Sequence, residues 1–430
     1  MSLIITVVTL LVTAHSRERP KLRQVHAFTL GNTVNGGLVG ALGPSVSTFQ
    51  ASTGLSHSAL ARTFCLNRLA KFAGTFIWAS YANRLQQGQA GWLSPRVVLC
   101  AVMAVEVVCS LLIVSVRTSA LALQLALAVF GMCYGLADSG FDLLTVWSET
   151  DDPKTTRTHV AMLNAGFTAG AVLTPAVVSA ALPLGGTCYA CFFVLALLSS
   201  LAALGMAACD MLPGGAPPPP SRKEACTAAD ATVLSQQQSL AVVICMVIVL
   251  FCSTGSEHVI GTWLPTLGAD VGRIPMATMA AMSAFYWTTI CAGRVGWCLL
   301  SSHIMSAWPV LAVDGAIMLV AGVLFASYRP AAGSWQLWIG TLLLGLGCAS
   351  SLPAALTMPT EVRVALTPNI LMCLNLAGTV GEMIAPFACG LFLQRGLYRS
   401  LGLSVVVMMT ALLGATGFAW GVSHNDTAFV

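Results

Sequence analysis

Long apolar stretches, separated by short polar breaks, run through almost the whole chain. A helix needs about 20 mostly apolar residues to cross the hydrocarbon core of a bilayer, so each stretch is long enough to span a membrane. Only 8% of the 430 residues are charged, against roughly 25% in a soluble domain. This composition excludes soluble enzymes, disordered scaffolds and extended nucleic-acid binders. Twelve helices are expected, over approximately 25–50, 58–83, 94–116, 119–148, 158–182, 186–209, 238–267, 275–300, 306–328, 335–360, 366–393 and 398–421.

The segment 210–237 differs from the rest because it is rich in Pro, Gly, Ser and Gln and holds the run Pro217 to Pro220. Such a composition cannot form a packed core and is typical of a flexible linker. We therefore expect a six-helix bundle over 25–209, a cytoplasmic linker over 210–237 and a second bundle over 238–421. The remaining segments, 1–24 and 422–430, are expected to be cytoplasmic tails, the first of them interfacial in part.

The two halves share a pattern of polar and helix-breaking residues. The fifth stretch carries Asn164, Gly170 and Pro175, and the eleventh carries the same residue types 211 positions later. A Gly-x3-Pro pattern likewise begins at Gly40 in the first stretch and at Gly261 in the seventh. These matches indicate a duplicated unit. The expected fold is an all-α membrane protein with two parallel six-helix repeats, parallel because six crossings return the chain to its starting side.

Several apolar stretches also carry pairs of glycines four residues apart, which lie on one face of a helix and let a neighbouring backbone approach closely. We expect helix contacts at Gly36/Gly40, Gly131/Gly135, Gly166/Gly170 and Gly417/Gly421.

Lys and Arg predict the orientation of the chain, because cytoplasmic segments carry an excess of them. With both termini inside, twelve basic residues fall on the cytoplasmic side and six on the outer side. We therefore expect both termini on the cytoplasmic side. The expected location is a multi-pass placement in the plasma membrane, with an organelle membrane as the alternative.

Several motifs resemble one branch of the major facilitator superfamily. They are Gly255-Ser256-Glu257-x3-Gly261-x-Trp263, Gly381-Glu382-Met383-x2-Pro386, Asp138-Ser139-Gly140 and Gly43-Pro44 followed by Thr53-Gly54-Leu55-Ser56. They are similar to motifs of sodium-dependent glucose transporter-like proteins and the major facilitator domain-containing protein four group, and more distantly of fucose permease. The resemblance implies a transporter fold and a hexose-like substrate.

The sequence departs from the pattern of that family at a few positions. The loop after the second stretch reads Asn83-Arg84, where the superfamily usually has Asp-Arg in an inward gate. Asp142 stands where the branch usually has Asn, and Leu163-Asn164 replaces a His-Phe pair. Because of these differences, we expect the gate, the ion coupling and the substrate to differ from those of the better-known members. We expect Asn83, Arg84 and Arg294 to belong to the gate region.

Charged residues within the stretches are the candidates for ion coupling, because a charge inside a bilayer costs about 2.5–3.5 kcal/mol. Asp138 and Asp142 lie one helical turn apart on the fourth stretch, and Arg68 and Lys71 share a face of the second. They form either a static ion pair or a coupling site whose pairing changes during transport. Glu382 is a third carboxylate, which either couples ions or bonds a backbone group freed by Pro386.

Four residues are expected to bind substrate. Glu257 offers a carboxylate to sugar hydroxyls, and the Trp263 ring is suited to stacking on a sugar, although Trp263 also fits an interfacial anchor. Asn164 and Asn375 occupy matching positions in the two halves, where their amides suit either sugar hydroxyls or bonds between helices.

The function that the sequence predicts is secondary active transport of a small polar solute by alternating access, with symport of H⁺ or Na⁺. A facilitative uniporter or organic-anion carrier is the alternative, and a non-transporting receptor or scaffold is the alternative from another class. The chain has no nucleotide-binding or hydrolase motif. We expect a monomeric non-enzyme that contacts membrane lipid and a small-molecule substrate, with no cofactor, no metal and no nucleic acid as a partner.

Overall fold

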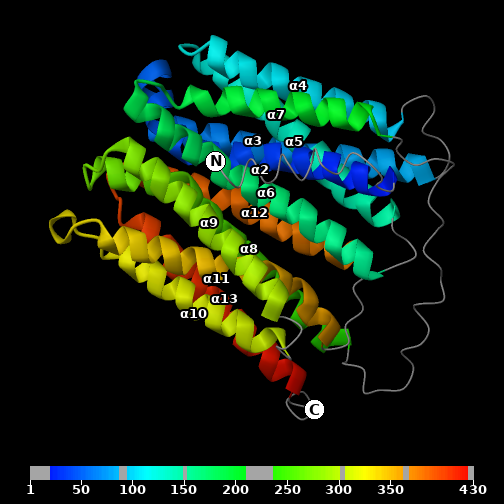
Figure 1. Cartoon of the computed structure of the whole chain (residues 1–430). Coiled ribbons are helices and arrows are strands. Elements are labelled where there is room, and N and C mark those ends of the chain that lie inside the picture. Colours follow the sequence, from blue (N-terminus) through cyan, green and yellow to red (C-terminus); the bar gives the residue numbers. More distant parts are fainter. Residues whose placement is uncertain are drawn as a thin grey trace.

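A computed structural model describes residues 20–86, 94–148, 153–209, 236–300, 306–361 and 368–424 (Figure 1). These residues form long α-helices and two short 3₁₀ segments, η1 (Leu182–Leu184) and η2 (Pro330–Ala332). The α-helices are α2 (Pro20–Thr53), α3 (His57–Gln86), α4 (Pro95–Ser115), α5 (Ala120–Ser148), α6 (Pro153–Ala181), α7 (Tyr189–Ala207), α8 (Gln236–Asp270), α9 (Met276–Leu300), α10 (Ala307–Ala326), α11 (Trp335–Glu361), α12 (Pro368–Leu393) and α13 (Ser400–His424).

Each of the twelve apolar stretches is a helix in the structure, with ends that differ from the expected ranges by a few residues. Within the described ranges, nine helices are long and apolar enough to cross a membrane. The other three are α2, α3 and α9. In α3 the lower hydropathy has a clear cause, because it carries charged residues such as Arg62, Arg68 and Lys71. The chain is an integral, multi-pass membrane protein.

The expected tails and linker lie mainly outside the described residues, which leave out 1–19, 210–235 and 425–430. At their edges the helices extend further than expected. Helix α2 begins at Pro20 rather than after residue 24, α8 begins at Gln236 within the expected linker, and α13 continues to His424. A helix satisfies its own backbone hydrogen bonds, so it can continue beyond the apolar residues that the sequence pattern marks.

The helices form two groups, α2–α7 and α8–α13, which we call the N-terminal and C-terminal halves (Figure 1). In the N-terminal half α2 packs on α6, α3 on α5 and α4 on α7. In the C-terminal half α8 packs on α12, α9 on α11 and α10 on α13. The halves meet where α3 contacts α12, α6 contacts α9 and α2 contacts α8.

Glycines set the closest of these contacts. A Cβ atom at Gly36 or Gly40 of α2 would collide with the backbone of α6, and one at Gly166 or Gly170 would collide with the backbone of α2. The two predicted pairs therefore face each other across one interface. Since no side chain separates the helices there, their backbones lie in van der Waals contact.

The third pair, Gly131/Gly135 of α5, faces the carbonyl oxygens of Asn67 and Lys71 on α3. The prediction of close helix contacts is thus confirmed for three pairs. It is wrong for Gly417/Gly421, because a Cβ atom at either position would meet nothing within 4 Å.

We call the end where α2 begins and α13 ends the terminal end, and the opposite end the distal end (Figure 1). The two halves contact each other at the distal end. His57 Nε2 of α3 lies 3.4 Å from Asp270 Oδ2 at the end of α8. The Ser58 amide donates to Gln394 Oε1 (3.2 Å), and Ser179 of α6 donates to the Ala277 carbonyl of α9 (2.9 Å).

A substitution at the α2–α6 interface tests this packing. Gly170→Val is expected to lower the free energy of unfolding by about 1–3 kcal/mol or more, because the added side chain forces two touching backbones apart. The matched control is Gly417→Val, where the space is open. Thermal unfolding of both variants in detergent measures the difference, and equal stability would contradict the close contact.

Candidate functional site

A cluster of charged side chains joins the two halves in the interior of the structure. Glu382 of α12 lies 3.3 Å from Lys71 Nζ and 3.6 Å from Arg68 Nη1, both on α3. His258 of α8 approaches the same carboxylate oxygen, with its Nε2 atom at 3.7 Å. Arg68, Lys71 and His258 are buried and Glu382 is half-buried. We call these four residues the central cluster.

The sequence of α3 and α5 positions the two cations. Arg68 and Lys71 are three residues apart and therefore lie on one face of α3. Gly135 lets α5 approach the backbone at Lys71, which brings Tyr134 beside the cluster. The Tyr134 hydroxyl accepts a hydrogen bond from Lys71 Nζ (3.1 Å), and its ring centre lies 4.3 Å from the same atom. The cation thus has a hydroxyl, a ring face and a carboxylate as neighbours.

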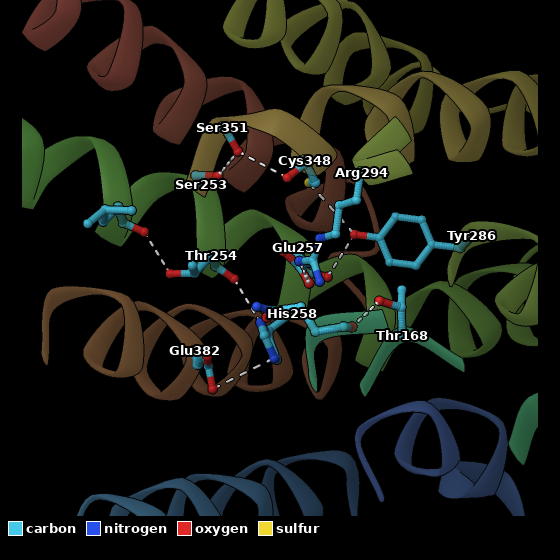
Figure 2. Close-up of polar contacts among 12 residues, drawn as sticks. Thr168, Ser253, Thr254, Glu257, His258, Tyr286, Arg294, Cys348, Ser351 and Glu382 are labelled. Carbon is cyan, nitrogen blue, oxygen red and sulfur yellow. Dashed lines mark hydrogen bonds and ion pairs between the residues drawn. The ribbon is translucent and has the colours of Figure 1, made fainter. Parts of the chain in front are cut away.

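Backbone contacts hold the His258 ring in place (Figure 2). Its Nδ1 atom lies 2.9 Å from the carbonyl oxygen of Thr254, one turn earlier on α8. The Thr254 hydroxyl in turn lies 3.0 Å from the Gly378 carbonyl of α12 and 2.6 Å from the Leu250 carbonyl. A carbonyl accepts a proton on Nδ1, which leaves Nε2 directed at Glu382.

A second charged pair lies beside the central cluster, within the C-terminal half. Glu257 precedes His258 on α8, and its Oε1 atom is 3.9 Å from Arg294 Nη2 of α9 (Figure 2). Tyr286 of α9 donates to the Glu257 carbonyl (3.1 Å), and Cys348 Sγ of α11 is 3.9 Å from the Tyr286 hydroxyl. Adjacent positions on α8 therefore direct one side chain to α12 and the other to α9.

A small cavity lies between Arg68, His258, Glu382 and the ring of Trp263. Its volume is about 10 Å³, close to the space that one water molecule needs. Trp263 is fully buried, and its Nε1 atom donates to the Pro386 carbonyl of α12 (2.9 Å). The ring therefore binds α12 to α8 in this conformation, and the cavity beside it has no room for a sugar.

Three of the five residues expected to couple ions lie together in the described part of the structure, and the two aspartates of α5 do not join them in an ion pair there. Arg68, Lys71 and Glu382 meet in the central cluster, and Asp138 lies on α5 one turn after Tyr134. Within the described residues neither Asp138 nor Asp142 forms an ion pair, and Asp142 is exposed. The cations of α3 are thus matched by the other half rather than by α5, because α12 packs directly against α3.

The remaining predicted residues lie apart from the cluster. Asn164 of α6 and Asn375 of α12 are exposed, and the carbonyl of each accepts a hydrogen bond from the threonine one turn later. Asn83 and Arg84 are exposed near the end of α3. Arg294, expected in the gate region, lies against Glu257 beside the central cluster.

Sequence reasoning missed two members of the site, Tyr134 and His258. A signal existed for each, since Tyr134 precedes Asp138 by one turn and His258 follows Glu257. Neither signal names a partner, because the partners belong to distant helices. In the described part of the chain, no group of three or more His, Cys, Asp and Glu side chains is arranged to hold a metal ion.

No protein-family model and no curated protein sequence matches the chain. Solved structures do match. The nucleoside transporter NupG is similar with a TM-score of 0.65 and 14% identity over 95% of this chain and 100% of NupG. A bacterial homologue of the human lysosomal transporter Spinster, in an inward-facing and occupied conformation, has a TM-score of 0.62 and 15% identity over 95% of this chain and 98% of that one.

A mutant of the peptide transporter POT is similar too, with a TM-score of 0.68 and 11% identity over 92% of this chain and 94% of that one. All of these proteins are named as transporters. At such identities the likeness concerns the fold, which this chain shares over almost its whole length.

Removing the shared carboxylate tests the central cluster. Glu382→Gln is expected to lower the free energy of unfolding by about 3 kcal/mol, because it leaves two buried cations without a counter-charge. Replacing both partners, as Lys71→Met with Glu382→Met, should recover part of that loss. Arg62→Gln, at an exposed position of α3, is the control. An unchanged stability of Glu382→Gln in detergent would contradict the pairing.

Trp263 provides a second test. Trp263→Phe keeps the aromatic bulk but leaves the buried Pro386 carbonyl without its donor, which is expected to cost about 1–3 kcal/mol. Trp335→Phe is the matched control, because the Trp335 side chain is 51% exposed. Chemical denaturation of the two variants measures the difference. Equal losses would show that the indole N–H contributes nothing specific.

Proposed function

We propose that the protein is a secondary active transporter that moves a small polar solute by alternating access. The central cluster carries this proposal, because Glu382 of one half is bound to two cations of the other, at the boundary that must open and close. The fold shared with known transporters supports it. The plasma membrane is the proposed location, with both termini on the cytoplasmic side.

The pattern of helix contacts supports a two-repeat architecture. The pair α2–α6 corresponds to α8–α12, α3–α5 to α9–α11, and α4–α7 to α10–α13, when each helix is matched to the one six places later. We propose that 25–209 and 238–421 are the repeated bundles, and that they rock about the central cluster. The contacts at the distal end then represent one of the two alternating states.

The central cluster suggests how an ion could drive the change. A proton or a sodium ion bound to Glu382 would offset its negative charge, and the attraction that holds α12 to Arg68 and Lys71 would weaken. Asp138 lies one turn after Tyr134 on α5, whose hydroxyl contacts Lys71, and is the proposed partner that would take over Lys71 within the N-terminal half. Lys71 would then keep a counter-charge while the halves separate at the distal end.

A hexose-like sugar is the proposed substrate, on the resemblance of the Glu257 and Glu382 motifs to sodium-dependent glucose transporter-like proteins. Glu257 and Arg294 offer an acceptor and donors close together, which suits neighbouring sugar hydroxyls. Asn164 and Asn375 are exposed, and we propose that they contact the solute when the halves move apart. An organic anion is the second candidate, because Arg294 and the cations of α3 would attract a carboxylate.

Uptake into proteoliposomes tests the proposal. Labelled glucose, uridine and a small organic anion are offered to the purified protein under an imposed pH or Na⁺ gradient. At one proton per solute, a gradient of one pH unit accumulates a neutral substrate about tenfold, since each tenfold ratio corresponds to 1.4 kcal/mol. Glu382→Gln is expected to abolish accumulation, whereas Arg62→Gln should retain it.

Different outcomes separate the candidates. Uptake without stimulation by either gradient would support a uniporter, and uptake of the anion alone would replace the sugar assignment. Accumulation that survives in both Glu382→Gln and Asp138→Asn would contradict the coupling role of the central cluster. Binding of a solute without translocation would favour a receptor on a transporter fold.

A further inference from the structure

A groove of about 1050 Å³ lies on the C-terminal half, away from the central cluster. Helices α8, α10, α12 and α13 form it, together with the loop before α13 and the segment that follows α10. Helices α12 and α13 are consecutive in the chain but contact each other only sparsely, so the groove fills the space between them. Its lining includes Phe251, Phe325, Phe392, Leu403 and Val407.

The walls of the groove on α12 and α13 are apolar and open to the surroundings of the protein. Phe392 is 44% exposed, Leu403 53% and Val407 67%. These residues belong to helices long and apolar enough to span a membrane, so their exposed side chains face the lipid tails. An acyl chain can therefore enter the groove from the bilayer without crossing a polar surface.

The distal mouth of the groove is cationic. Arg329, between α10 and η2, and Arg399, directly before α13, both line the groove and are exposed. Within the described part of the chain neither guanidinium forms an ion pair. Two unmatched guanidinium groups at the mouth of an apolar groove are complementary to a molecule with an anionic head and an apolar tail. Guanidinium groups bind phosphate oxygens in a bidentate manner.

The length of the groove agrees with a lipid of one leaflet. Its wall on α13 runs from Ser400 to Met408, which corresponds to roughly 12 Å at 1.5 Å per helical residue. Half of a hydrocarbon core of about 30 Å is close to this value. With its head at the arginines, a lipid tail lying along α13 would thus reach the middle of the membrane.

We propose that this groove is a binding site for an anionic phospholipid. The phosphate lies between Arg329 and Arg399, and one acyl chain lies along α13 against Leu403 and Val407. The bound lipid covers the space between α12 and α13 and supplies contacts that these two helices do not make with each other. This site is independent of the proposed transport function and of the substrate.

Lipid binding to the purified full-length protein tests the proposal. Native mass spectrometry in detergent measures the affinities for dioleoyl phosphatidylglycerol and dioleoyl phosphatidylcholine, which have the same tails and differ in net charge. The double variant Arg329→Gln, Arg399→Gln is expected to bind phosphatidylglycerol about thirtyfold more weakly, from roughly 1 kcal/mol for each cation. Its affinity for phosphatidylcholine should change little.

Two further variants make the result specific to the groove. Arg395→Gln removes an exposed cation of the same loop that does not line the groove, and is expected to leave the phosphatidylglycerol affinity unchanged. Ser404→Trp fills the apolar part and should weaken the binding of both lipids. Equal affinity of the unaltered protein for the two lipids, or equal losses in Arg395→Gln and the double variant, would overturn the proposal.

Discussion

The structure depends most on how a few charges are matched inside a low-dielectric environment. A single carboxylate, Glu382, is shared by Arg68 and Lys71, which belong to the opposite half of the molecule. An unmatched charge is costly in this setting, so these groups hold α12 against α3 as long as they remain charged. The contact is also reversible, because a cation bound to Glu382 neutralises the negative charge that attracts Arg68 and Lys71. Stability and the proposed transport cycle thus rest on one interaction.

The glycines decide where these charges can meet. Gly135 brings α5 against Lys71 and thereby places Tyr134 over the ammonium group. Gly36, Gly40, Gly166 and Gly170 bring α2 and α6 into backbone contact in the same half. On the other side, Thr254 and Trp263 of α8 bond to backbone carbonyls of α12, on either side of Glu382. The central cluster is therefore set in a frame of close helix contacts on both sides.

The sequence predicted the helices and three of the four residues of the central cluster, and it did so for different physical reasons. Apolar length identifies a membrane helix locally, so all twelve stretches were found. A buried charge is equally conspicuous, and Arg68, Lys71 and Glu382 were recognised as functional candidates for that reason. Their pairing was not predictable, since residues 71 and 382 are far apart in the chain and Asp138 offers an equally plausible partner. Gly417 and Gly421 show the same limit, because a glycine pair indicates a possible contact and not whether a helix lies opposite.

Composition and periodicity alone determined that this chain lies in a membrane as a bundle of helices, because the cost of exposing backbone or charge to lipid leaves few other solutions. They also identified the charged side chains that need a counter-charge inside the membrane. Only the tertiary structure decided that Glu382 bridges the halves, that Arg294 turns to Glu257, and that Arg329 and Arg399 stand at the mouth of one groove. Each of these side-chain placements depends on which helices pack side by side. The packing of the helices depends in turn on contacts along whole helix faces, which no single residue reveals.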